Sequence, residues 1–181
     1  MDRPRPGVDL HADAVRGLVA VHTPAGRPTD TDAVSYWRSW GSDPDKDEEN
    51  RRFTRLEAGL FTWGGLRARY LEAARAMTSA LAGADPSSVV ATQGHAITVT
   101  DLASTLAVEA TLHHLDLVTN LSAAGPSTAG LAEVRRGVRA LLDRDLTGWP
   151  DERVARVGTG RAAPTKDELI DLGGSPVPVF T

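Results

Sequence analysis

Apolar residues along this chain recur mainly at intervals of three and four, the period of an α-helix, and strict alternation is scarce. Residues 9–22 place Leu10, Ala14, Leu18 and Val21 on one face and predict a helix. The same reasoning predicts further helices at the following ranges: 31–40, 50–82, 100–120 and 128–145. The pattern therefore indicates an all-α protein.

The longest predicted helix, residues 50–82, carries a stripe of large apolar residues that we expect to face a core. The stripe consists of Phe53, Leu56, Leu60, Trp63, Leu66, Tyr70, Ala74, Met77 and Leu81. Gly64 and Gly65 interrupt it, and each lowers helix propensity by about 1 kcal/mol relative to alanine. A kink or a close helix approach is expected there.

Turn residues and caps separate the helices. The acidic run GSDPDKDEEN (residues 41–50) is expected to be a solvated loop, and residues 89–95 a connector with a short extended stretch. Thr100, followed by Asp101, is the expected N-cap of the helix over 100–120. Near the end of the chain, Thr165 and Glu168 form a capping-box pattern that opens one short helix before Gly173.

Size and composition limit the classes of protein to which the chain can belong. Its 181 residues suit one domain, and we expect a helical bundle over residues 1–150 with an irregular C-terminal extension over 151–181 packed on it. A net charge of −4 with scattered basic residues argues against nucleic acid, and no apolar run approaches the roughly 20 residues needed to cross a bilayer. The N-terminus shows no signal-peptide pattern, so a cytoplasmic location is expected. Because the chain has no cysteine, any thiol chemistry must use an external thiol.

The stretch VEATLHHLDL (residues 108–117) combines an apolar helix with ionisable residues. On a helical wheel with Glu109 at zero, His113 falls at roughly 40° and Asp116 at roughly −20°. This line of charge runs down the middle of an apolar face, with Leu106 and Leu117 on one flank.

Burying an unpaired carboxylate costs several kcal/mol, so a partner or a metal is expected beside Glu109. Glu109 and His113, at i and i+4, lie close enough to hold one zinc, nickel, iron or manganese ion with a third ligand from another helix. Asp116, one turn beyond His113, is expected to orient a ligand or act as a base.

A structural alternative remains open for the same residues. Glu109 and His113 can pair with each other or with an arginine across the bundle, such as Arg16, Arg52 or Arg135. His114 falls on the small-residue side of the helix and is expected at the surface or between helices. His95, at the far end of the helix from His113, is expected to be structural.

The segment from Thr92 to Leu117 resembles the signature helix of the mycothiol-dependent maleylpyruvate isomerase N-terminal domain, in the DinB-like metal-binding bundle superfamily. Residues 32–37 (DAVSYW) and 158–173 resemble the short single-domain actinobacterial members. The likeness spans most of the chain, and its most specific part is VEATLHHLDL.

The resemblance implies a DinB-like up-and-down four-helix bundle that holds a divalent metal, often zinc, through a histidine of the second bundle helix and through Glu109 and His113. It also implies that the metal activates a low-molecular-weight thiol, such as mycothiol, for isomerisation or transfer on a small molecule. Relative to the family, the first helix is expected to be missing before Met1, and the first histidine has no secure counterpart. Asp9 falls closest by spacing, and His11 restores the usual nitrogen ligand.

Two functions are therefore expected to compete. One is a metal- and thiol-dependent isomerase or transferase with Glu109, His113 and His11 as ligands. The other is a non-catalytic metal-binding or interaction module whose exposed groove, left by the missing helix, meets a partner or a second copy in a homodimer. The C-terminal domain that helps full-length isomerases bind the thiol is also absent, which argues against maleylpyruvate isomerase activity itself.

Overall fold

The computed structural model describes residues 6–39, 44–119 and 121–180. Over these residues the chain forms helices α1 (Pro6–Val21), α2 (Pro44–Leu60), α3 (Trp63–Gly83), α4 (Val99–Val118), α5 (Thr128–Leu142), α6 (Asp151–Gly158) and α7 (Lys166–Leu172). A 3-10 helix (Ser35–Ser39) and one hairpin, β1 (Val89–Thr92) with β2 (His95–Thr98), complete the described elements. The mainly helical class predicted from the sequence is confirmed.

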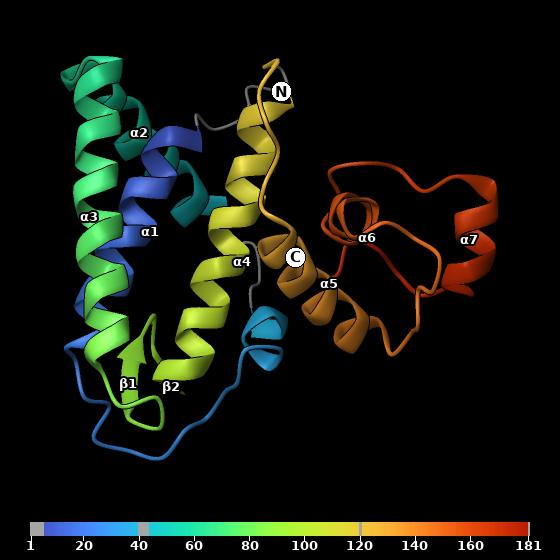
Figure 1. Cartoon of the computed structure of the whole chain (residues 1–181), viewed down its shortest axis with the longest axis horizontal. Helices are drawn as coiled ribbons and strands as arrows, with labels where there is room; N and C mark the ends of the chain where they lie inside the picture. Colours follow the sequence, from blue (N-terminus) through green and yellow to red (C-terminus); the bar gives the residue numbers. More distant parts are fainter. Residues whose placement is uncertain (1–5, 40–43, 120, 181) are drawn as a thin grey trace.

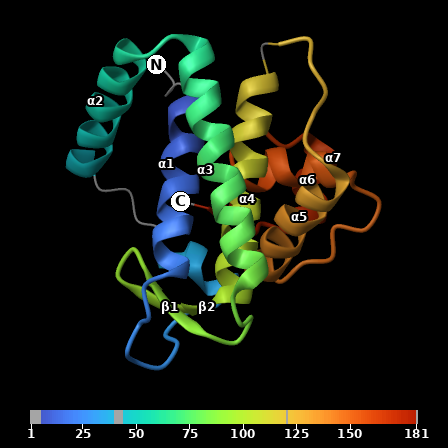
Figure 2. The same cartoon turned by 60° about the vertical axis from the view of Figure 1, so that its left-hand side comes forward.

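Helix α4 lies at the centre of the molecule, with α1 and α3 on one side and α5 on the other (Figures 1 and 2). It buries apolar residues on several sides, among them Leu102, Leu106, Val108, Leu112 and Leu115. Successive helices from α1 to α5 alternate in direction in both views. Among the polar side chains on the α1 side of α4, Glu109 is consequently buried at 6% exposure.

The hairpin connects α3 to α4 and packs at the C-terminal end of α1. Its strands pair antiparallel from Val89 with Thr98 to Thr92 with His95, so the extended connector predicted from the sequence is part of a small sheet. The expected N-cap at Thr100 is wrong by two residues. Thr98 caps α4, since its side chain accepts a hydrogen bond from the Asp101 amide at 3.0 Å and donates to the Asp101 carboxylate at 2.7 Å.

The predicted single helix over residues 50–82 is two helices. The Thr62 side chain caps α3 by accepting from the Gly65 amide at 3.2 Å, and α2 stands off the body in Figure 2. As a result the expected core residues of the first half are exposed: Phe53 64%, Leu56 60%, Leu60 70% and Trp63 67%. The second half behaves as predicted, with Leu66 buried and Met77 packed against the core.

The acidic loop predicted over residues 41–50 is helical from Pro44 onward, while residues 41–43 lie outside the described part of the chain. The expected helix over 31–40 is a single 3-10 turn. The Asp32 carboxylate accepts from the amides of Val34 and Ser35 and opens this turn, which buries Tyr36 and Trp37. Trp40 lies outside the described residues.

The C-terminal region contains a helix that the sequence analysis missed. Helix α6 buries Val154, Ala155 and Val157 against α5, and a Cβ on Gly158 would come within 2.5 Å of Val138, so the two helices approach closely. Val154, Ala155 and Val157 belong to the same hydrophobic core as α4 and α5. The last turn of α5 ends at Leu142, three residues before the predicted end at 145.

The capping box of α7 is confirmed. The Thr165 side chain accepts from the Glu168 amide at 3.3 Å, and the Glu168 carboxylate accepts from the Thr165 amide at 2.7 Å. Gly173 ends the helix with a left-handed φ of 56°, as its position predicts.

Candidate functional site

Four ionisable side chains from two helices meet where α1 crosses α4. Asp13 and Arg16 are three residues apart on α1, and Glu109 and His113 are four apart on α4, so each pair lies on one face of its helix. Glu109 is 6% exposed and Asp13 9%, whereas Arg16 and His113 reach toward the surface. Two buried carboxylates thus lie together with a guanidinium and an imidazole.

The contacts within this cluster are uneven. Arg16 Nη2 donates to Asp13 Oδ1 at 2.5 Å, but Arg16 Nη1 is 3.4 Å from Glu109 Oε2. His113 Nε2 lies 3.0 Å from Asp13 Oδ2. That carboxylate oxygen is buried and makes no hydrogen bond to any described residue, so its contact with the imidazole is close without hydrogen-bond geometry.

Gln93 of the hairpin and Tyr36 of the 3-10 helix extend this cluster by hydrogen bonds. With its amide oxygen turned toward α1, Gln93 accepts from Arg16 Nε at 2.9 Å and Nη1 at 2.7 Å, and its amide nitrogen donates to the Tyr36 hydroxyl at 3.0 Å. Gln93 has a φ of 47°, which a side-chain-bearing residue rarely adopts. The tight turn of the hairpin therefore places this amide against Arg16.

Burial shapes the electrostatics of the site. Desolvation, followed by repulsion from Asp13, raises the pKa of Glu109 to about 7, against the opposing attraction of Arg16 and His113. Burial alone would lower the pKa of Arg16, but Glu109 and Asp13 outweigh it and the pKa is raised. Arg16 stays charged, whereas Glu109 changes its charge near neutral pH.

The predicted inward position of Glu109 is confirmed. The arginine partner considered as the structural alternative is also present, because Arg16 is the guanidinium beside Glu109. His11, predicted as the third ligand, lies with its Nε2 3.4 Å from Arg69 Nη2 of α3. The side chain of Asp9 is outside the described part of the structure.

The described residues do not include a complete set of metal ligands. Within that part of the chain, no three His, Cys, Asp or Glu residues are placed to hold one metal ion together. The His11, Glu109 and His113 set is thus not brought together as a ready triad.

The other polar residues singled out in the sequence have separate partners. The Asp116 carboxylate accepts from Arg161 Nε at 2.9 Å and Nη2 at 2.7 Å, which ties α4 to the C-terminal region. His114 is half-buried with its Nε2 3.1 Å from the Ala124 carbonyl oxygen. His95 lies on β2 beside Asp30, in agreement with the structural role expected for it.

Asp13 and Gln93 are the members of the cluster that the sequence analysis did not select. A helical wheel could have found Asp13, because it lies roughly 60° from Leu10 on the buried side of α1. Nothing local marks Gln93, because its role depends on a turn that brings the hairpin to α1.

Two surface hollows lie near these elements. One, of about 360 Å³, is bounded by α1, α3, α4 and the segment before α5, and is lined by Leu10, Tyr70, Ala110, Thr111, His114, Leu117, Pro126 and Ser127. Leu10 and Leu117 are each about one helical turn from the ionisable cluster. This hollow is the nearer and more apolar of the two.

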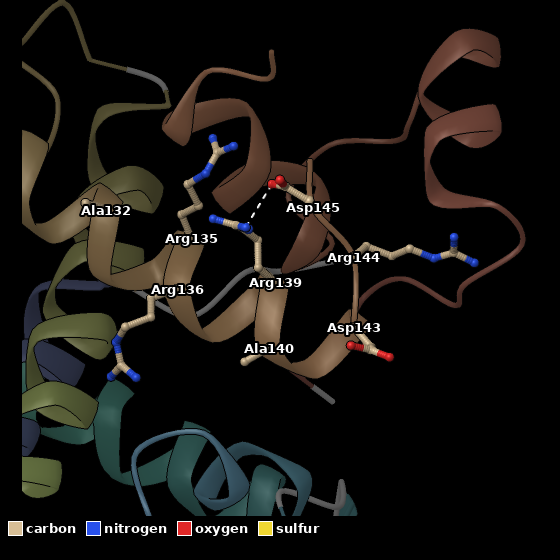
Figure 3. A pocket seen from close by; sticks show the side chains of 8 residues that line it. All are labelled: Ala132, Arg135, Arg136, Arg139, Ala140, Asp143, Arg144 and Asp145. Atoms are coloured by element: carbon tan, nitrogen blue, oxygen red, sulfur yellow. Dashed lines mark ion pairs between the residues drawn. The ribbon is translucent and has the colours of Figure 1, made fainter. Parts of the chain in front are cut away.

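The other hollow, of about 490 Å³, is lined by four arginines of the α5 region (Figure 3). Arg135 pairs with Asp151 at 3.0 Å, Arg139 pairs with Asp145 at 2.8 Å, and Arg136 pairs with Glu133 at 2.6 Å. In Figure 3 the side chains of Arg136 and Arg144 point in different directions. Because three of the four guanidinium groups are in ion pairs and Arg136 and Arg144 point apart, this hollow is a weaker candidate for a ligand site.

Comparison of the chain with protein-family models, with curated proteins and with solved structures found no match. In the described part of the chain, no helix has the length and apolar character to span a bilayer. A function can therefore be proposed only from the geometry of the α1–α4 junction.

Proposed function

We propose that this chain is a divalent-metal-binding helical-bundle protein, with zinc the expected ion, and that its centre is the junction of α1 and α4. The observation that carries the proposal is the contact of Asp13 Oδ2 with His113 Nε2 at 3.0 Å, one helical turn from buried Glu109. Two ligands of one zinc ion lie roughly 3 Å apart, since each bond is about 2.0–2.1 Å.

The chemical types of the available donor atoms suit a divalent ion. A buried carboxylate oxygen without a hydrogen bond among the described residues, an imidazole nitrogen and a second buried carboxylate are the hard and borderline ligands that zinc, iron or manganese takes. Asp13 replaces the histidine that the family resemblance would place on this helix. Glu109 and His113 keep the roles that the resemblance gives them.

The reaction proposed is isomerisation or transfer on a small molecule with an external thiol such as mycothiol, which is the chemistry that the resemblance of VEATLHHLDL implies; the chain has no cysteine of its own to supply a thiol. When bound, the metal would lower the pKa of a thiol or of water. Glu109, whose pKa is raised to about 7 in the metal-free protein, would have to release its proton before its carboxylate could bind the metal.

The hollow of about 360 Å³ beside the junction gives a small substrate a place to bind. Half of the residues that line it are apolar, and the other half carry polar groups, among which Tyr70 and His114 can orient a substrate. The DinB-like architecture remains part of the proposal, and the alternation of helix directions is in keeping with it.

A second candidate is a non-catalytic module in which the same residues form a structural ion network. The observation that favours it is Arg16, whose guanidinium already neutralises Asp13 and lies beside Glu109. In that case the junction would need no metal.

Zinc binding by the whole chain distinguishes the two candidates. Protein stripped with chelator and titrated with zinc should take up one equivalent, and His113→Ala should lose it because one nitrogen ligand is removed. His22→Ala is the matched control, since His22 lies just beyond the end of α1. Absence of zinc uptake by a protein with a normal helical circular dichroism spectrum would support the structural network instead.

A spectroscopic readout tests the thiol part independently of turnover. In the cobalt-substituted protein, addition of a low-molecular-weight thiol should produce the near-ultraviolet charge-transfer band of a cobalt–thiolate bond. Metal binding without this band would leave the metal site standing and remove the thiol from the proposal.

A further inference from the structure

Exposed apolar side chains gather on α2 and at its turn into α3. Half of the large apolar residues that are exposed in the described part of the chain lie there: Phe53, Leu56, Leu60, Phe61 and Trp63. On a helical wheel the three residues of α2 lie within about 60° of one another and form one stripe. An exposed apolar surface of this kind marks a place where a protein meets another apolar surface.

The stripe ends at a short turn at one end of the molecule. Helix α2 ends at Leu60 and α3 begins at Trp63, and both views place the turn between them at that end (Figures 1 and 2). Thr62 caps α3, and the Arg69 guanidinium carbon lies 4.5 Å from the centre of the Phe61 ring. The turn is thus held in shape while Leu60 and Trp63 stay exposed.

The segment around this turn is basic, although the chain as a whole is acidic. Residues 51–69 contain five arginines and one glutamate, a net charge of +4, whereas the whole chain carries −4. The exposed arginines among them are Arg52, Arg55, Arg67 and Arg69. Arg52 lies roughly 40° from Leu56 around α2, and Arg67 is one turn along α3 from Trp63. Because arginines flank the apolar residues, the surface suits a partner that is both apolar and anionic.

The other end of α2 limits which part of the helix can meet such a partner. Residues 45–49 contain four acidic residues and one lysine. Glu48 is about 18 Å from Leu60 along the helix axis, which exceeds the Debye length of roughly 8 Å at physiological ionic strength. The basic end can therefore face an anionic surface while the acidic end stays away from it.

We infer that the turn between α2 and α3, with the C-terminal half of α2, is a peripheral binding site for bilayers that contain anionic lipids. Leu60 and Trp63 insert at the boundary between headgroups and acyl chains, and the arginines lie against the anionic headgroups. Leucine and aromatic side chains flanked by arginine are typical of helices that bind at a bilayer surface without spanning it. The inference concerns a surface apart from the α1–α4 junction and needs no metal there.

Two other occupants fit this surface less well. A two-fold contact between two copies through this end would bring two segments of +4 together, and repulsion between like charges opposes it. An acidic protein partner would have to supply a groove for side chains that lie at a turn, whereas a bilayer takes them up without one. A bilayer therefore fits both the shape and the charge.

Co-sedimentation of the whole chain with vesicles tests the inference. The protein should bind equimolar phosphatidylcholine–phosphatidylserine vesicles, with weaker binding at higher salt, and should not bind vesicles of phosphatidylcholine alone. Leu60→Ala should bind the anionic vesicles about tenfold more weakly, because fewer apolar groups enter the bilayer. Ile170→Ala is the matched control. Ile170 is 76% exposed, against 70% for Leu60, but it lies on the acidic helix α7 and should leave binding unchanged.

Arg67→Gln measures the contribution of charge. It should weaken binding to the anionic vesicles about fivefold, which is the effect of one arginine near such a surface. Arg75→Gln is its control, because Arg75 is also exposed on α3 but lies about 12 Å farther along the helix. If Leu60→Ala does not fold, Arg67→Gln decides alone, and unchanged binding overturns the inference.

The remaining outcomes are equally definite. Failure of the unmodified protein to bind anionic vesicles overturns the inference, as does equal binding to neutral vesicles or undiminished binding by folded Leu60→Ala. Sedimentation velocity without vesicles should show a monomer. A dimer that Leu60→Ala dissociates would assign the surface to a second copy instead. The proposed metal site is untouched by any of these results.

Discussion

Helices α4 and α2 differ in whether their apolar faces are buried. Helix α4 buries a glutamate at 6% exposure in the middle of an apolar face, whereas α2 leaves Phe53 and Leu60 at 64% and 70% exposure. Both carry apolar residues at spacings of three and four. The period of a helix thus identifies its apolar face, but neighbouring elements decide whether that face is buried.

The neighbours of the two helices explain the difference. Helix α4 has α1 on one side and α5 on the other, and the hairpin fixes its start. Helix α2 is separated from α3 by the cap at Thr62 and stands off the body in Figure 2. A face with neighbours must accommodate its polar residues in a network, and a face without them keeps its apolar residues in contact with solvent.

Truncating one leucine on each helix should give the largest difference between the two helices in the loss of free energy of unfolding. Leu115→Ala on α4, where the leucine is 0% exposed, should lower the free energy of unfolding by about 2–5 kcal/mol, because it removes buried methyl groups and leaves a cavity. Leu56→Ala on α2 should change it by less than about 0.5 kcal/mol. Urea denaturation followed by circular dichroism measures both.

A large loss of stability in Leu56→Ala would break the comparison. It would mean that the face of α2 is buried in solution, and sedimentation at several concentrations would then show whether a second copy covers it.

Most of the architecture could be predicted from the sequence, and the misses have local causes. The helix of VEATLHHLDL and the capping box at Thr165 were predictable because their signals are strong and local. The break between α2 and α3 was harder to predict, since Gly64 and Gly65 indicated a kink, whereas α2 ends at Leu60 and a threonine cap three residues before Gly65 starts a new helix. Helix α6 was missed because its eight residues are too few to establish a period.

About half of the residues in the candidate site could be predicted from the sequence. Glu109 and His113 followed from their place on one face of α4, and Arg16 was among the partners considered. His11 was favoured for its nitrogen, but it is two residues from Asp13, roughly 200° around α1, and so lies against Arg69. Gln93 depended on the fold of the hairpin, which no spacing along the chain encodes.

The buried glutamate of α4 should make the stability of the metal-free protein depend on pH, an effect that the exposed face of α2 should not produce. Because the pKa of Glu109 is raised from 4.5 to about 7, the folded state holds a proton that the unfolded state has released between these values. The stability that Glu109 contributes is therefore fully present below about pH 4.5 and is lost as the pH rises through about 7. The melting temperature should fall by a few degrees between pH 5 and pH 8, at about 2–4 °C per kcal/mol for a chain of this size.

Glu109→Gln should flatten that decline, because the amide stays neutral at every pH. The carboxylates with lowered pKa, such as Asp85 and Glu168, lose their stabilising effect at more acid pH and do not interfere in this window. Differential scanning calorimetry in the presence of chelator measures the effect, and an equal decline in Glu109→Gln would contradict the assignment.

The smallest expected difference concerns the ion pairs of the two helices. The Asp116 carboxylate of α4 receives two hydrogen bonds from Arg161, and both side chains are partly buried at 33% and 22% exposure. On α2, Arg52 Nε lies 3.4 Å from Glu48 and the arginine side chain is 77% exposed. Arg161→Met should cost about 1 kcal/mol in urea denaturation, because a two-bond, partly desolvated pair is lost, whereas Arg52→Met should cost no more than about 0.3 kcal/mol. Zinc affinity adds a second measurement on Arg161→Met: an unchanged value means that Asp116 only anchors the C-terminal region, and a changed value means that it also acts on the proposed metal site one turn away.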